Sequence, residues 1–284
     1  MYAGLTLVTP PTGEPVSVAD VTLHSRITTS ADASMVAGYI SSARRIVEGQ
    51  AAVALMPQSW RLALRHWPGR SVRQAADLSE YYKYNHIELP RPPLQSITSF
   101  IYTDVNGITY PMTQGYDNAA GNYLLDLDSQ PGRIYLPYSG LWPVTILLPA
   151  NPIEIVFVAG YSAFAGTVNV DATGLLVTWV SGSLFDPTMA GSFIQINGAS
   201  CSVLTVTDTN DIVLAVKTTP NQTGVGYTAN SVPHNYKQAI CLLAADMYQN
   251  REATLIDSMP TDLPYGVKAL LDLDRNFHPL GQGY

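Results

Sequence analysis

Apolar side chains recur at helical spacing in three parts of the chain. Between residues 33 and 50 they fall three or four positions apart, which predicts an amphipathic helix with one buried stripe. The same spacing predicts a helix over 232–250 and a last, shorter helix over 267–274. Near the start, Ser17-Val-Ala-Asp20 has the composition of a capping box, so a short helix is expected from there to residue 27.

Alternation of apolar and polar residues predicts strands in the first half of the chain. The apolar residues of 58–67 fall on one face, while Arg61 and Arg65 fall on the other, as in a half-buried strand. Further strands are expected at 87–89, 95–102 and 153–158, and Asp104-Val-Asn-Gly107 has the composition of a hairpin turn.

The segment Leu89-Pro-Arg-Pro-Pro-Leu94 separates two of these strands. Three prolines in four positions cannot lie inside a helix or a central strand, because each lacks an N–H group and fixes its own φ. The segment therefore predicts a rigid corner between strands. Arg91 is the one charge between the prolines, and we expect it at a contact between subunits.

The composition changes over residues 165–230. This segment contains a single Lys, four Asp and no Arg, Glu or His, and it is rich in Thr, Val, Gly, Ser and Asn. Short strands alternate with turns, which predicts a small all-β module, either a barrel or a sandwich. The expected strands are 175–180, 192–196, 202–207, 212–216 and 225–228.

Charge is scarce in the whole chain. Charged residues make up 13% of the 284 residues, against about 25% in an average globular protein. Together with 17 tyrosines this favours a protein with extensive subunit interfaces, and a β-rich domain with Thr- and Ser-bearing strands is the alternative. The net charge of −7 lacks the basic footprint of a nucleic-acid binder. No signal peptide and no membrane span are expected.

Residues that could carry chemistry do not converge on a catalytic pattern. The sequence around Ser162 lacks the second glycine of a nucleophile elbow, and the two cysteines have no metal-site spacing. The carboxylate pairs Asp126/Asp128 and Asp272/Asp274 lie beside turns or helix ends, where solvated side chains are common. A hydrolase using Ser162 or a carboxylate pair stays open as a rival, but we expect no enzyme, cofactor or metal site.

The order of these elements resembles the head–tail connector (adaptor) proteins of tailed bacteriophages, the gp6-like and gp8-like group. The resemblance covers residues 5–162 and 231–275, and the 165–230 segment is an insertion relative to that pattern. The motifs that carry it, in order, are Glu14-Pro-Val-Ser17, Gln58-Ser-Trp60, Ile87-Glu-Leu-Pro-Arg-Pro-Pro-Leu94, Pro131-Gly-Arg133, Val156-Phe-Val-Ala-Gly-Tyr161 and Leu263-Pro-Tyr-Gly-Val-Lys-Ala-Leu-Leu271.

The resemblance implies a virion structural protein of the neck, assembled in the host cytoplasm. Twelve copies would form a ring below the portal protein, extend the channel for double-stranded DNA without sequence-specific binding, and provide a platform for a tail terminator, tail tube or further neck protein. It also implies that the C-terminal tail 275–284 contacts the portal. The residues expected at that contact are Arg275, Asn276, Phe277, His278 and Leu280, and those expected between subunits are Arg91, Tyr81, Tyr82, Arg61 and Arg65.

The sequence and the resemblance together predict an α+β fold. Helices from both termini would form a bundle, with a central antiparallel β unit and an inserted all-β barrel or sandwich. The body would comprise 1–163 and 231–284, and the insertion 164–230. The alternative function is a phage structural binding module, whose inserted β domain contacts a receptor, a glycan or another virion protein.

Overall fold

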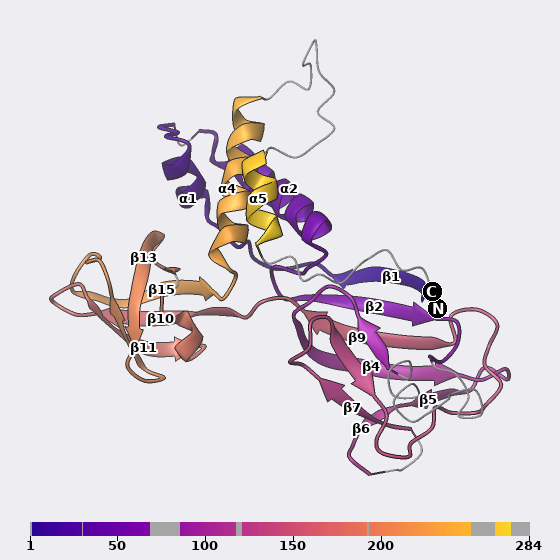
Figure 1. The fold of residues 1–284 in the computed structure, drawn as a ribbon. Coiled ribbons are helices and arrows are strands. Elements are labelled where there is room, and N and C mark those ends of the chain that lie inside the picture. Colours follow the sequence, from indigo (N-terminus) through magenta and orange to yellow (C-terminus); the bar gives the residue numbers. More distant parts are fainter. Residues whose placement is uncertain are drawn as a thin grey trace. The chain divides into compact units, whose positions relative to one another are not determined.

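The computed structural model describes residues 2–29, 31–68, 86–117, 121–191, 193–250 and 265–273 (Figure 1). The described residues divide into two compact units. The first unit comprises 2–12 and 52–160, and the second comprises 13–51 and 161–273.

The first unit contains two β-sheets that share one hydrophobic core. The larger is antiparallel, and its strand order is β1 (Tyr2–Thr9), β2 (Gln58–Leu64), β9 (Ile153–Ala159), β4 (Leu94–Thr103) and β5 (Thr109–Pro111). The smaller has the order β3 (Ile87–Leu89), β8 (Gly132–Tyr135), β7 (Asn122–Asp126) and β6 (Thr113–Gln114). Buried side chains of both sheets, including Leu62, Phe157, Leu89 and Ile134, form one cluster. The alternation in β9 places every second side chain in this core.

Among the described residues, the second unit joins four helices to a closed barrel (Figure 1). The helices α1 (Val18–His24), α2 (Ala33–Ala51), α4 (His234–Gln249) and α5 (Tyr265–Asp272) pack against one another. The barrel has the order β10 (Ala163–Val170), β11 (Leu176–Gly182), β14 (Asp211–Leu214), β13 (Ala199–Val206), β12 (Phe193–Ile196) and β15 (Gln222–Asn230), and one turn of 3₁₀ helix, η2 (Pro187–Met189), packs on it.

Two local predictions for the helices are confirmed. The side chain of Ser17 accepts a hydrogen bond from the Asp20 N–H at 3.1 Å, and the Asp20 carboxylate accepts one from the Ser17 N–H at 2.9 Å, which is a complete capping box. The helix α2 buries one stripe, as expected. That stripe includes Arg44, whose guanidinium is paired with Glu14 at 2.7 Å and with Glu48 at 2.8 Å.

The expected fold class is wrong. The structure is mostly β, with 38% of the described residues in strands and 22% in helices, and it is not a helical bundle built from both termini around a central β unit. The chain's first element is the strand β1, and the antiparallel unit is two sheets with a core of their own. The short strand β8 pairs with β3, more than forty positions earlier in the chain, so local periodicity does not reveal this pairing.

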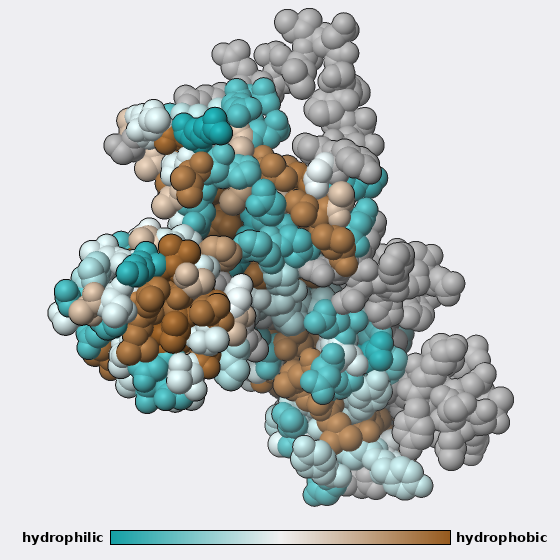
Figure 2. All heavy atoms as spheres, turned by 60° about the vertical axis from the view of Figure 1, so that its left-hand side comes forward, coloured by the Kyte–Doolittle hydropathy of each residue, from teal (hydrophilic) through white to brown (hydrophobic). Residues whose placement is uncertain are grey.

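The 165–230 segment does form a barrel, and strand β10 precedes the strands that were expected there. Figure 2 shows apolar side chains gathered on the surface of the barrel, where Leu176, Leu204 and Val216 are exposed. The domain boundaries 1–163 with 231–284, and 164–230, stay a prediction. The residue contacts group the barrel with the helices in the second unit.

Polar side chains connect the barrel to the helices within the second unit. Gln195 on β12 donates a hydrogen bond to the Asp20 carboxylate at 3.1 Å, and Asn230 on β15 donates one to the Pro15 carbonyl, also at 3.1 Å. The Lys237 ammonium on α4 reaches the carbonyl of Asn230 at 3.5 Å. Lys237 is 9% exposed, and burial, opposed by the nearby Asp20 carboxylate, lowers its pKa from 10.5 to about 8.

Replacing Lys237 with methionine is therefore expected to stabilise the second unit at neutral pH. Below pH 8 the buried amine is charged in the folded chain at a cost, and that cost disappears as the pH rises from the folded pKa of about 8 to the unfolded value of 10.5. At pH 7 the variant Lys237→Met should gain about 2 kcal/mol in the free energy of unfolding. Urea unfolding at pH 7, 8, 9 and 10 would measure this. The gain should shrink towards pH 10, and a gain that is constant with pH would contradict the explanation.

Candidate interaction surfaces

The basic residues predicted at subunit contacts lie on the first unit. Arg61 is exposed on β2, and Arg65 is exposed just beyond its end. The guanidinium of Arg91 lies over the Trp60 ring, 5.4 Å from its centroid, so Arg91 makes a cation–π contact within its own chain. Tyr81 and Tyr82 lie outside the described residues. An intersubunit role of these five residues stays a prediction.

The residues predicted to contact the portal also lie outside the described residues. They are Arg275, Asn276, Phe277, His278 and Leu280. Their role at a portal contact stays a prediction. Two other surfaces of the first unit, both among the described residues, are exposed and apolar, and neither was predicted from the sequence.

The first of these surfaces is strand β1, which forms an edge of the five-stranded sheet. Its described side chains, from Gly4 to Thr9, are all exposed, including the apolar residues Leu5, Leu7 and Val8. Within the described residues β1 pairs only with β2. Soluble proteins protect such an edge with charges, prolines or short strands, and β1 has eight residues with neither charge nor proline.

Other sheet edges among the described residues are protected. The opposite edge strand, β5, has three residues and ends in Pro111, and the edges of the smaller sheet, β3 and β6, have three and two residues. The barrel is closed and has no edge. Strand β1 is thus the long unprotected edge of the described chain, and an exposed edge of this kind is a template for pairing with another polypeptide.

The second surface, which we call the tip, consists of Val105, Ile108, Val144 and Ile146. These four apolar side chains are between 51% and 93% exposed. Val105 and Ile108 belong to the turn between β4 and β5, and Val144 and Ile146 belong to the segment that leads into β9. A hydrogen bond from the Val105 N–H to the Ile146 carbonyl, at 2.8 Å, ties the two halves together.

Hydrogen bonds of one buried carboxylate order the turn. Asp104 is 4% exposed, and one of its oxygens accepts hydrogen bonds from the backbone N–H groups of Asn106 and Ile108, both at 2.9 Å. The other oxygen accepts from the Tyr110 hydroxyl at 3.4 Å. Burial and the Asp104 charge raise the pKa of Tyr110, so the phenol stays protonated and donates.

The segment 136–148, which we call the arm, is fixed at two points. Trp142 is buried and stacks on Trp67 with the ring centroids 4.9 Å apart and an interplanar angle of 7°. Leu147 packs against the core and forms a β-bridge with Asp104. Because these residues hold the arm, its exposed apolar side chains are presented in a fixed arrangement.

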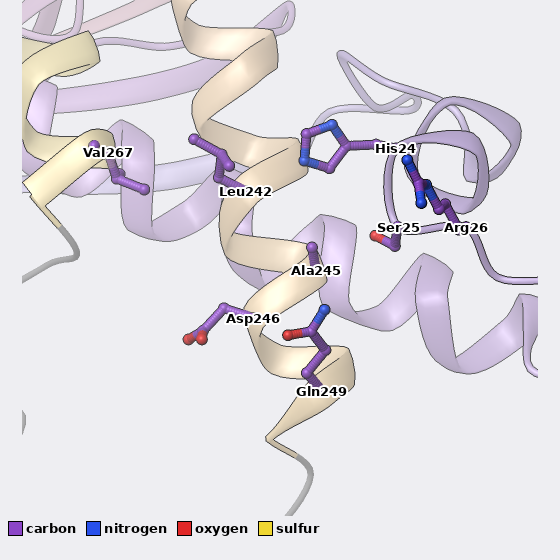
Figure 3. Close-up of a pocket in the computed structure, with 9 residues that line it drawn as sticks. His24, Ser25, Arg26, Leu242, Ala245, Asp246, Gln249 and Val267 are labelled. Carbon is purple, nitrogen blue, oxygen red and sulfur yellow. The ribbon is translucent and has the colours of Figure 1, made fainter.

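A groove of about 500 Å³ lies between α1, α4 and α5 in the second unit (Figure 3). Its lining includes His24, Ser25 and Asp246, residue types that occur in hydrolase triads. Among the described residues the Ser25 hydroxyl has no hydrogen-bond partner, so none of them pairs with it as a base. We therefore assign no catalytic role to the residues that line the groove.

The other candidates for chemistry have structural partners. Ser162 uses its backbone carbonyl to accept a hydrogen bond from the Ser231 N–H at 3.0 Å. Asp126 accepts hydrogen bonds from the hydroxyl and N–H of Ser129, which lower its pKa, and it thereby caps a turn. Asp274, the partner proposed for Asp272, lies outside the described residues. Within the described ranges, no cluster of three or more His, Cys, Asp or Glu could hold a metal ion.

Trp179 and Phe185 are the aromatic side chains of the barrel that would favour receptor or glycan binding if they were exposed on its loops. Phe185 is 2% exposed in the barrel core, and Trp179 packs partly buried against the same core. Exposed aromatic side chains on the barrel loops would have favoured that alternative, and these two residues do not provide them.

No helix in the described part of the chain is long and apolar enough to cross a membrane.

Comparison with known proteins identifies the fold. No protein-family model and no curated protein matches this chain. The chain is similar to a chain in the neck of an empty gene transfer agent (GTA) particle computed with C6 symmetry, at 22% identity and a TM-score of 0.53, over 98% of both chains. It is also similar to a chain in the neck of a native GTA particle computed with C12 symmetry, at 21% identity and a TM-score of 0.51, over 98% of both chains. A third similar chain, in the virion of a native GTA particle, has 20% identity and a TM-score of 0.52, over 98% of this chain and 97% of the other. At these identities the likeness shows a shared fold.

Proposed function

We propose that this protein is a structural component of the neck of a phage-like virion. The observation that carries the proposal is the likeness to chains of gene transfer agent necks over 98% of this chain, including the barrel. Because the match covers 98% of both chains, it includes both units and not one common module. A non-enzymatic role agrees with the surfaces described above, which offer contacts for neighbours.

Within the neck we propose the role of an adaptor that forms a ring below the portal protein. The neck particles of the similar chains were computed with C6 and C12 symmetry, which favours a ring of repeated copies. In this role the ring extends the DNA channel and carries a tail terminator, a tail tube or a further neck protein. The net charge of −7 would let double-stranded DNA pass, because an acidic wall repels phosphate.

Electron microscopy of the purified full chain, alone and mixed with the portal protein of its own particle, tests this proposal. We expect rings with rotational symmetry, and in the mixture we expect them stacked coaxially on the portal. A chain that stays monomeric alone and does not join the portal would overturn the proposal.

Deleting residues 275–284 is expected to abolish binding to the portal while leaving the ring intact. The removed segment contains the five residues proposed for that contact, with Phe277 as its apolar anchor. Co-sedimentation with the portal would measure the loss. A shorter deletion of 281–284 keeps all five residues and serves as the matched control. Binding by the longer deletion at wild-type affinity would contradict the assignment of the tail.

A further inference from the structure

Strand β1 and the tip have complementary properties and lie on one compact unit. Both lie in the first unit, on its five-stranded sheet, where β1 forms one edge and the β4–β5 hairpin forms the other. Neither surface exposes a charged side chain, since residues 2–13, 105–109 and 134–153 contain no Asp, Glu, Lys or Arg and the carboxylate of Asp104 is buried. Apolar surfaces without charge are suited to cover each other, because no ion loses its hydration.

We infer that β1 of one copy is covered by the arm and tip of the next copy. This inference rests on the proposed function and names the contact that would hold the ring together. A ring of more than two copies needs two different surfaces on each chain, because a self-complementary patch closes into a dimer. The first unit offers such a pair at the two sides of one sheet.

The chemistry of β1 restricts what can cover it. Its outer edge presents backbone N–H and C=O groups, which are satisfied by an extended segment and not by a helix. Val144 and Ile146 lie on either side of a bend at Thr145, and at 93% and 73% these side chains are among the most exposed apolar groups of the described chain. The arm therefore supplies apolar side chains for Leu5, Leu7 and Val8, and the backbone of Val144, which lies in no helix or strand, supplies an N–H and a C=O group for the strand edge.

A mixing experiment with two charged variants tests the inference. Val144→Lys alters the arm and Val8→Lys alters β1, and both residues are exposed, so the chain should still fold. Each variant alone should lose all species larger than the monomer in sedimentation velocity. An equimolar mixture should form a heterodimer and nothing larger, because the two chains together retain one intact pair of surfaces.

Leu23→Lys is the matched control, since Leu23 is an apolar residue that is 81% exposed on the second unit. It should assemble like the wild type. Single-cysteine variants then locate the contact: oxidation with copper phenanthroline should link Val8→Cys to Val144→Cys in a mixture, and neither should link to itself. The native thiols, Cys201 and Cys241, are buried and should not compete.

Each outcome has a separate meaning. If the wild type forms rings and both Lys variants do so as well, the inference is wrong and the proposed function stands. A disulfide between two Val8→Cys chains would show two-fold pairing of β1 and would also overturn the inference. If the wild type forms no ring, alone or with its portal, both the proposed function and the inference fail.

Discussion

Replacing Gly160 with alanine is expected to prevent the first unit from folding. Gly160 directly follows β9 and has a φ of +130°, a conformation that side chains other than glycine rarely adopt. A Cβ atom here would lie 2.8 Å from the backbone nitrogen of Pro57 and closer still to the carbonyl of Met56. Backbone atoms cannot rotate away as a side chain could. The clash and the strain should cost more than about 4 kcal/mol, a large part of the stability of a typical domain.

The surroundings of Gly160 leave little room for relief. Its N–H donates to the Pro93 carbonyl at 2.8 Å, and its carbonyl accepts from the Gln95 side chain at 2.8 Å. The fluorescence of Trp60, Trp67 and Trp142, which all belong to the first unit, would report its unfolding in urea. Gly4→Ala is the control, because its Cβ would meet nothing within 4 Å. A Gly160→Ala variant with the wild-type unfolding midpoint would show that the backbone can shift.

Predictions from sequence succeeded where the signal is local. The capping box of Ser17 and Asp20 needs four residues, and the stripe of α2 needs one helix, so neither depends on distant partners. The alternation of β9 is also a local signal. Strand β1 was missed because its order comes from pairing with β2, fifty or more residues away in the chain.

The candidate surfaces could not be predicted because exposure is not encoded locally. The run 134–153 is free of charge and rich in apolar residues, which is typical of a buried segment. In the structure Trp142 points into the core, while Val144 and Ile146 point outward. The cation–π contact of Arg91 is of the same kind, because the fold brings Trp60, thirty-one positions earlier, under its guanidinium, while its role at a contact between subunits stays a prediction. Such contacts depend on the fold as a whole and are not visible in the local sequence. The fold class was wrong for the same reason, because local patterns do not show how distant strands pair.

The variant Asp104→Ala is expected to weaken both the fold of the first unit and its assembly. Asp104 holds the turn of the tip through bonds to two backbone N–H groups, which would be left without their acceptor. Loss of a buried charged acceptor should lower the free energy of unfolding by about 3 kcal/mol. The tip would also lose its fixed shape. Binding of the next copy would then have to order the tip, which costs free energy of association. Self-association should therefore weaken at least tenfold, or by about 1.4 kcal/mol.

The variant Asp104→Asn separates the two roles of the carboxylate. Its amide oxygen can still accept from the N–H groups of Asn106 and Ile108, while its amide nitrogen cannot accept from the Tyr110 hydroxyl. We expect it to lose about 1 kcal/mol of stability and to assemble nearly like the wild type, because the turn keeps its shape. Urea unfolding and sedimentation velocity on the same samples measure both effects. If Asp104→Ala unfolds earlier but assembles with wild-type affinity, an ordered tip is not required at the contact between copies.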